Sequence, residues 1–220
     1  MLPIEVVVKR LDTRAEAVAA AARLLSPAER LRATTFPAER DRRAFVVAQA
    51  LLRELLGSRL AVAPETFEFV RDGRGKPALA PRFVASELRF SVDHTEDVAV
   101  YAFAHGLEVG IDVELVRDVP EVDRIGSGLF SHAECEAYGH LDPLDRSLAF
   151  LRCWTRKEAL LKAIGTRAGP RLDRCTVSLT PGEPARILEV DGVPGERCGF
   201  TLSDFAPGQG FLGAVAVQTS

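Results

Sequence analysis

Three carboxylates with the potential for metal or acid-base chemistry lie between residues 107 and 165. LEVGIDVEL (107–115) has the pattern of a strand, in which side chains alternate, so Asp112 and Glu114 share one side. SLAFLRCWTRKEALLKAIG (147–165) has the pattern of a long helix, and at about 100° per residue Glu158 falls inside its apolar arc. A carboxylate that points inward is costly unless it is paired, hydrogen-bonded or bound to metal. The pattern therefore predicts a cation shared by the three acids.

Each motif also has an ordinary structural interpretation. A DxE pair is usually the solvent-facing side of a half-buried strand, and KExxxK is usually an exposed ladder of ion pairs on a helix. However, Lys157 and Glu158 fall on the apolar side of the helix, with Lys162 at its edge, which disfavours exposure. A few oxygen ligands suit Mg²⁺, which takes its remaining positions from water and substrate phosphates. We therefore expect Mg²⁺, with Mn²⁺ as an alternative.

The composition is that of an ordinary globular protein. The chain has 220 residues, of which 47% are hydrophobic and 27% charged, enough for one large domain or two small lobes. Its net charge of −3 provides no overall attraction to nucleic acid or anionic membrane. No membrane-length apolar stretch or signal peptide is recognised, and the four cysteines form no CxxC pair. These features predict a soluble, cytoplasmic monomer with reduced thiols.

The first half reads as strands and helices in alternation. We expect a strand in residues 1–12, a helix over 13–25, a short helix beginning near 26–27, a long helix from about 37 to Gly57, a strand that leads through a turn at Asp72 and Gly73 into a hairpin or a loop, and two strands within 88–104. Further strands are expected near 175–179, 198–203 and 211–217.

The second half repeats the first. Residues 43–56, RAFVVAQALLRELL, align without gaps with residues 152–165, RCWTRKEALLKAIG, and the order of the following strands also recurs. We predict an α+β fold of two pseudo-symmetric lobes, residues 1–106 and 107–220, each a small, mainly antiparallel sheet packed on a long helix, with the active site between them. Gln49 aligns with Glu158, so only the second lobe carries the third acid.

Two separated motifs carry a resemblance to a known family. GIDVE at 110–114, followed by WTRKEALLKAIG at 154–165, resembles the paired signature of the 4′-phosphopantetheinyl transferase superfamily. GRGKP at 73–77, with the basic helix upstream, is similar to the long, two-lobed, surfactin-synthetase-activating form. The resemblance implies transfer of phosphopantetheine from coenzyme A, the substrate, to a serine of an apo acyl or peptidyl carrier protein.

The resemblance also implies roles for particular residues of the second lobe. Asp112, Glu114 and Glu158 match the acids that hold Mg²⁺ against the coenzyme A pyrophosphate. Lys162 matches a lysine that approaches the phosphates, where it would neutralise charge on the leaving 3′,5′-ADP. Lys157 matches another motif position and is expected at coenzyme A. Glu158, directly or through a metal-bound water, is the expected base for the carrier serine.

The first lobe is expected to hold the remaining phosphate of coenzyme A. Multidentate cationic donors suit such a group, and the available cations are Arg30, Arg32, Arg40, Arg42, Arg43 and Lys76. Arg43, Lys76 and the adjacent Pro77 match family positions, although a solvated basic helix face explains some of the arginines. His94 and Thr95 lie where the family shows Ser-His-Ser, and they are also expected at coenzyme A. Asp93 departs from that pattern, because a carboxylate would repel a nearby phosphate; residue 93 is expected either to contact phosphate through its backbone only or to turn its side chain away.

Two other classes of function remain open. The chain is either a transferase of this kind, a non-catalytic module that binds coenzyme A or a carrier, or another Mg²⁺-dependent enzyme of nucleoside diphosphates, such as a hydrolase. Carrier docking is expected on residues 117–140, especially Leu129 and Phe130, for which core packing is the ordinary alternative. The sequence does not distinguish fatty acid, polyketide and nonribosomal peptide carriers.

Overall fold

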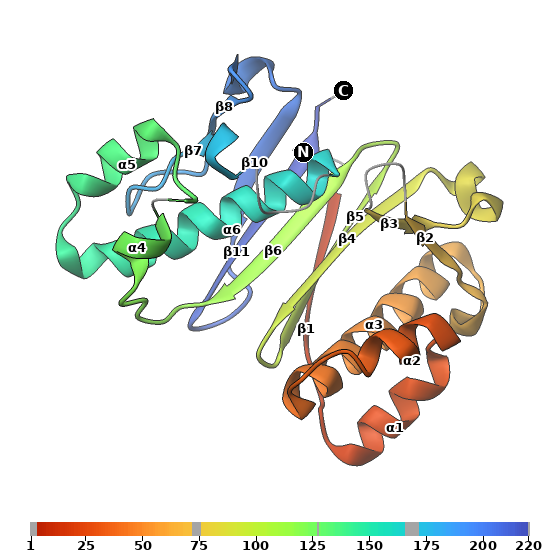
Figure 1. Cartoon of the computed structure of the whole chain (residues 1–220). Helices are drawn as coiled ribbons and strands as arrows, with labels where there is room; N and C mark the ends of the chain where they lie inside the picture. Colours follow the sequence, from red (N-terminus) through yellow and green to blue (C-terminus); the bar gives the residue numbers. More distant parts are fainter. Residues whose placement is uncertain (1–3, 72–75, 127, 166–171, 220) are drawn as a thin grey trace.

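The computed structural model describes residues 4–71, 76–126, 128–165 and 172–219 (Figure 1). The first half contains β1 (Ile4–Arg10), α1 (Ala15–Leu24), α2 (Pro27–Ala33), α3 (Glu39–Leu60), β2 (Phe69–Arg71), β3 (Pro77–Leu79), β4 (Leu88–Thr95) and β5 (Val98–His105). The second half contains β6 (Val109–Leu115), α4 (Val122–Gly126), α5 (His132–Gly139), α6 (Arg146–Ile164), β7 (Cys175–Val177), β8 (Ile187–Val190), β9 (Val193–Pro194), β10 (Phe200–Phe205) and β11 (Phe211–Gln218).

The two halves build their main sheets in the same order. In the first half, β5 lies between β1 and β4, and in the second half β11 lies between β6 and β10. Every one of these pairings is antiparallel. Each half therefore places its last strand between the two earlier ones, and each has one long helix, α3 or α6. The predicted α+β fold with two pseudo-symmetric lobes is confirmed.

The alternation of side chains along the strands explains how the layers stack. In β5, alternate residues pack in an apolar layer between the two sheets, and the intervening residues pack with α3. The layer between the sheets includes Val98, Val100 and Ala102 of β5 and Val109, Ile111 and Val113 of β6. The molecule thus has four layers, with α3 and α6 outside and the two sheets inside (Figure 1). The expected alternation in β6 is confirmed, because Asp112 falls on the side toward α6.

A glycine allows α6 to approach β6 closely. A Cβ atom at Gly110 would lie 2.0 Å from the carbonyl oxygen of Ala159 and 2.3 Å from the backbone nitrogen of Ala163. No side chain fits in that space, so helix and strand come together at the glycine of the GIDVE motif. The position of this contact brings Asp112, two residues farther along β6, next to the C-terminal half of α6.

Most predicted elements are present, with local differences. The helix expected to stop at Gly57 continues to Leu60, and Ala61 ends it in a left-handed conformation with φ of 53°. A Cβ at position 57 would lie 2.7 Å from the Val62 oxygen, so this glycine accommodates the chain as it folds back after the helix. Strands β8 and β9 were not expected from the sequence. The hairpin of β2 and β3 is confirmed, while its expected turn at residues 72 and 73 lies outside the described residues.

Two side chains of the segment expected to dock a carrier lie in the core, and docking on the rest of residues 117–140 stays a prediction. Leu129 and Phe130 are 3% and 6% exposed and pack with Tyr138 and Phe150 in the second lobe. The docking prediction for these two side chains is therefore wrong, because they anchor the segment between α4 and α5 to α6. Among the described residues, no helix is both long and apolar enough to cross a membrane.

Candidate active site

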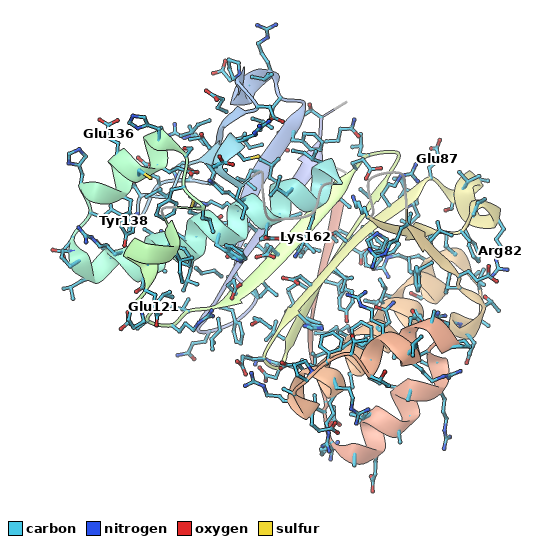
Figure 2. All side chains as sticks on the ribbon, viewed as in Figure 1. Arg82, Glu87, Glu121, Glu136, Tyr138 and Lys162 are labelled. Carbon is cyan, nitrogen blue, oxygen red and sulfur yellow. The ribbon has the colours of Figure 1, made fainter. Side chains whose placement is uncertain are left out.

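Residues of the two motifs meet where β6, α6 and β4 come together. Lys162 extends from α6, and its Nζ lies 2.7 Å from Asp112 Oδ1 on β6 and 3.3 Å from Asp93 Oδ1 on β4. Figure 2 shows Lys162 beside α6, near the middle of the molecule. The second carboxylate oxygen of Asp112, Oδ2, is buried and makes no hydrogen bond. The site therefore combines strand, helix and first-lobe residues that are far apart in the sequence.

Burial and neighbouring charges shift the pKa values of the acids at this junction. Burial raises the pKa of Asp112 well above its usual value, and the charge of Asp93 raises it further, against the opposing effect of Lys162. Burial likewise raises the pKa of Glu114, despite the nearby Arg117. Burial raises the pKa of Glu158 too, with added repulsion from Asp93 and Glu114. Each acid is thus held where its ionised form is disfavoured and where additional positive charge would stabilise it.

Lys162 is the positive group that these acids share. Although burial acts to lower the pKa of Lys162, the negative charges of Asp112 and Asp93 raise it above its usual value. The lysine is therefore a permanent cation at neutral pH. Lys162 and the Arg117 beside Glu114 face four carboxylates, those of Asp93, Asp112, Glu114 and Glu158, so negative groups outnumber these two cations at the junction.

The donor set fits a divalent cation. Asp112 Oδ2 is buried without a hydrogen-bond partner, as expected for an oxygen that binds a metal ion when one is present. A cation would also relieve the repulsion among the acids. Over the described ranges, no three histidine, cysteine or acidic side chains are already grouped closely enough to hold a metal by themselves. A small number of carboxylates is typical of Mg²⁺, which fills its coordination with water and substrate oxygens.

Lys157 does not join the acids. Its Nζ donates to the carbonyl oxygens of Leu129 and Leu172 at 2.8 and 2.7 Å and lies 2.5 Å from the Glu134 carboxylate. The side chain is fully buried, and these contacts occupy its three donors. The structure therefore does not support the expectation that Lys157 contacts coenzyme A, because its charge is already used inside the second lobe.

The first-lobe candidates lie at several separate places. Arg43 Nε donates to Glu39 at 2.8 Å, and Lys76 Nζ donates to Glu108 and to the Val109 carbonyl, both at 2.8 Å. Lys76 thereby joins the first lobe to β6. Pro77 begins β3, and His94 and Thr95 end β4, where both are partly exposed.

A cavity opens beside α3 in the first lobe. Its volume is about 280 Å³, and its lining includes Arg32, Gln49, Arg71, Pro77 and Val92. His94 shares a face of β4 with Val92, since the two are two positions apart in the strand. The cavity, His94 and two arginines are therefore on the α3 side of β4, while Asp93 points to the side of β6.

The sequence did not identify the partner of one participant and missed another. Of the two alternatives expected for Asp93, the side chain that turns away is the one observed, and its partner Lys162 was not foreseen. The alternation of Asp93 with apolar Phe90 and Val92 was the signal that could have placed it on the other face. Arg71 was absent from the expected cations, and no pattern in the sequence distinguishes it from surface arginines.

Comparison with known proteins gives one consistent family. Residues 108–204 match the model of the 4′-phosphopantetheinyl transferase superfamily, and residues 12–105 match the model described as 4′-phosphopantetheinyl transferase, N-terminal. The chain is 33% identical over 193 residues to 4′-phosphopantetheinyl transferase HetI of Nostoc sp., covering 88% of this chain and 78% of HetI.

A more distant sequence relative is also named a phosphopantetheinyl transferase. The chain is 31% identical over 184 residues to an L-aminoadipate-semialdehyde dehydrogenase-phosphopantetheinyl transferase of Pongo abelii, covering 78% of this chain and 58% of that protein. The solved holo-ACP-synthase of Plasmodium yoelii covers 51% of this chain and 94% of its own, with a TM-score of 0.39 and 13% identity, a likeness too low to bear on the fold.

Proposed function

The chain belongs to the 4′-phosphopantetheinyl transferase superfamily, and we propose that it transfers 4′-phosphopantetheine from coenzyme A to a serine of an apo acyl or peptidyl carrier protein, releasing 3′,5′-ADP. The observation that carries the proposal is the meeting of the two motifs: Lys162 of the helix motif contacts Asp112 of the strand motif at 2.7 Å. Each motif supplies only some of the groups of the proposed site, and the fold brings the two sets together.

The acids of the second lobe are suited to hold a divalent cation. Asp112, Glu114 and Glu158 would ligate Mg²⁺, with Mn²⁺ as an alternative. When bound, the cation would neutralise the pyrophosphate of coenzyme A. Support comes from the burial and mutual repulsion that raise the pKa of all three carboxyl groups.

Lys162 and Glu158 are the proposed catalytic side chains. Lys162 keeps its charge, so it can stabilise negative charge that develops on the leaving phosphate oxygen. Burial raises the pKa of Glu158, which makes this carboxylate a stronger acceptor for the proton of the attacking serine. The serine oxygen attacks the β-phosphorus, its proton passes to Glu158, and the bond to the 3′,5′-ADP oxygen breaks. Positioning and neutralisation of charge provide most of the rate in such transfers.

The first lobe is the proposed binding site for the nucleotide end of coenzyme A. Arg43, Lys76, Pro77, His94 and Thr95 remain its candidates. Pro77 lines the cavity beside α3 together with Arg32 and Arg71, and arginine forks are suited to phosphate. Lys76 is paired with Glu108, so a phosphate contact would require this lysine to exchange partners. Lys157 is left out of the proposed binding site.

A mass-shift assay tests the proposal. The full chain is incubated with coenzyme A, Mg²⁺ and a panel of apo carriers from fatty acid, polyketide and nonribosomal peptide systems, and the carriers are weighed by mass spectrometry. Gain of one phosphopantetheine on a carrier is the expected result, and the panel identifies the class served. Binding of coenzyme A without mass gain on any carrier would favour a non-catalytic module, while carrier-independent release of 3′,5′-ADP would favour a hydrolase. A monomeric state and a cytoplasmic location remain predictions.

A further inference from the structure

Asp93 of the first lobe contacts two elements of the second. The backbone N–H of Val113 on β6 donates to Asp93 Oδ2 at 3.1 Å, and Lys162 Nζ of α6 lies 3.3 Å from Asp93 Oδ1. Each oxygen therefore has a different partner across the lobe boundary. Val113 stands between Asp112 and Glu114, the two proposed cation ligands of β6.

Other first-lobe side chains contact the same edge of β6. Ser91 Oγ accepts a hydrogen bond from Ile111 N at 3.1 Å, and Lys76 Nζ donates to the Val109 carbonyl at 2.8 Å. Three side chains thus meet residues 109, 111 and 113, which alternate along one strand edge. Asp93 differs from Ser91 because its second oxygen also reaches Lys162. Ser91 consequently provides an internal control for the purely structural part of this arrangement.

Lys162 lies close to two carboxylates, of which only Asp112 is also a proposed cation ligand. Asp112, at 2.7 Å, is the closer partner, but it is also a proposed ligand of the divalent cation. A cation and an ammonium group compete for one carboxylate, because both are positive. Asp93 is held by the β6 backbone, so it remains available to Lys162 when Asp112 turns to another cation.

We propose that Asp93 is a positioning residue whose negative charge holds Lys162 at the lobe boundary and so releases Asp112 for the divalent cation. The orientation of Lys162 toward substrate phosphates rests on the proposed function. The competition between Lys162 and the cation for Asp112 does not require transfer to any carrier. In this arrangement the first lobe sets the charge balance of a site whose ligands all belong to the second lobe.

Replacement of Asp93 by asparagine isolates its charge. Asp93→Asn keeps an oxygen that accepts from Val113 N but removes the negative charge beside Lys162. Titration of the full chain with MgCl₂ in a calorimeter should show a dissociation constant raised about tenfold, in the range typical of coupled charged pairs. The midpoint of thermal unfolding should stay close to that of the wild type. The fold-decrease in kcat should be larger than the fold-change in the KM for coenzyme A.

Ser91→Ala is the control variant, and it should instead lower the midpoint of thermal unfolding and leave Mg²⁺ affinity unchanged.

A double-mutant cycle with Lys162 decides whether Asp93 acts through the lysine. In a Lys162→Met background, or Lys162→Gln should the first variant not fold, Asp93→Asn should change Mg²⁺ affinity by less than about threefold. An equal effect in both backgrounds would overturn the proposal, because Asp93 would then act on the cation directly. Wild-type Mg²⁺ affinity and kcat in Asp93→Asn would also overturn it.

The same measurements separate this proposal from the proposed function. Coupling between Asp93 and Lys162 in Mg²⁺ binding, with no transfer to any carrier, would reject the transferase activity and retain the positioning role. Transfer without coupling would reject the positioning role alone. Absence of Mg²⁺ binding by the wild-type chain would reject the positioning role of Asp93 together with the proposed cation site.

Discussion

Both lobes contain a short helix that begins with the same capping arrangement. In the first lobe, Ser26 and Glu29 form a capping box at the start of α2, and in the second lobe Ser131 and Glu134 form one at the start of α5. Each glutamate also pairs with a buried cation from the long helix of its own lobe. The two lobes therefore share a buried ion pair that ties a capping helix to a long helix.

The cation comes from different positions in the two long helices. Glu29 is held by Arg53, at 2.6 Å, and by Gln49, at 2.7 Å. In the alignment of residues 43–56 with 152–165, these positions correspond to Lys162 and Glu158. Glu134 is instead held by Lys157 at 2.5 Å.

The difference accounts for the proposed acidic site lying in the second lobe and not in the first. In the first lobe, positions 49 and 53 are used to hold its own capping glutamate. In the second lobe, Lys157 performs that task, so Glu158 and Lys162 are available to face β6. The internal ion pair of the second lobe thus uses a different helix position from that of the first lobe, which leaves Glu158 and Lys162 for the proposed catalytic roles. The largest consequences should follow from substitutions that remove this difference.

Glu158→Gln gives the second lobe the residue that the first lobe has at the equivalent position. We expect transfer to fall by at least about a hundredfold, because the variant loses both a cation ligand and the proposed base. Carrier modification followed by mass spectrometry measures the loss. Activity near that of the wild type would reject the proposed role of Glu158.

The same variant has a pH-dependent effect on stability. The folded-state pKa of Glu158 is raised above its unfolded value, so its contribution to stability falls as pH rises through these values. At about pH 7, glutamine should leave the free energy of unfolding unchanged or higher, and this gain should vanish at about pH 4, where the carboxyl group is protonated. Denaturant unfolding at both pH values tests the sign, and a loss of stability at neutral pH would contradict it.

Lys157→Met and Arg53→Met test whether the two ion pairs are equivalent. Lys157→Met leaves the buried Glu134, and Arg53→Met the partly buried Glu29, without its main cation, and we expect a loss of about 3–5 kcal/mol in the free energy of unfolding. Urea unfolding measures the loss, and Lys162→Met is the matched control because Lys162 is partly exposed and is not part of either capping pair. A smaller effect of Lys157→Met than of Lys162→Met would contradict the structural role of Lys157.

Ser26→Ala and Ser131→Ala should have the smallest effects. Each removes the side-chain acceptor of one capping box, and the typical cost is about 1 kcal/mol. Similar losses in both variants would confirm that the two capping helices are equivalent units. A loss confined to one lobe would show that the duplicated boxes have diverged in strength.

The sequence predicted correctly on which face of the strand or helix the site residues lie, but it did not predict their contacts. Alternation in β6 correctly placed Asp112 on the side opposite Val109 and Ile111, and helical periodicity correctly sent Lys157 and Glu158 inward. Helical periodicity could not predict which residues Lys157 and Glu158 would contact. Adjacent helix residues point about 100° apart, so one inward side chain meets Glu134 and the other meets the acids of β6.

The sequence by itself determined the duplicated α+β plan, the two motifs and the acidic character of the site. Only the tertiary structure decided which lysine serves the core, that Leu129 and Phe130 are internal, and that Asp93 reaches across to Lys162. The physical reason is that periodicity is a local property, whereas these choices depend on which side chain of another element lies opposite. In the strand and helix motifs, Gly110 permits the close approach, and the packing of two lobes completes the set of charges around Lys162.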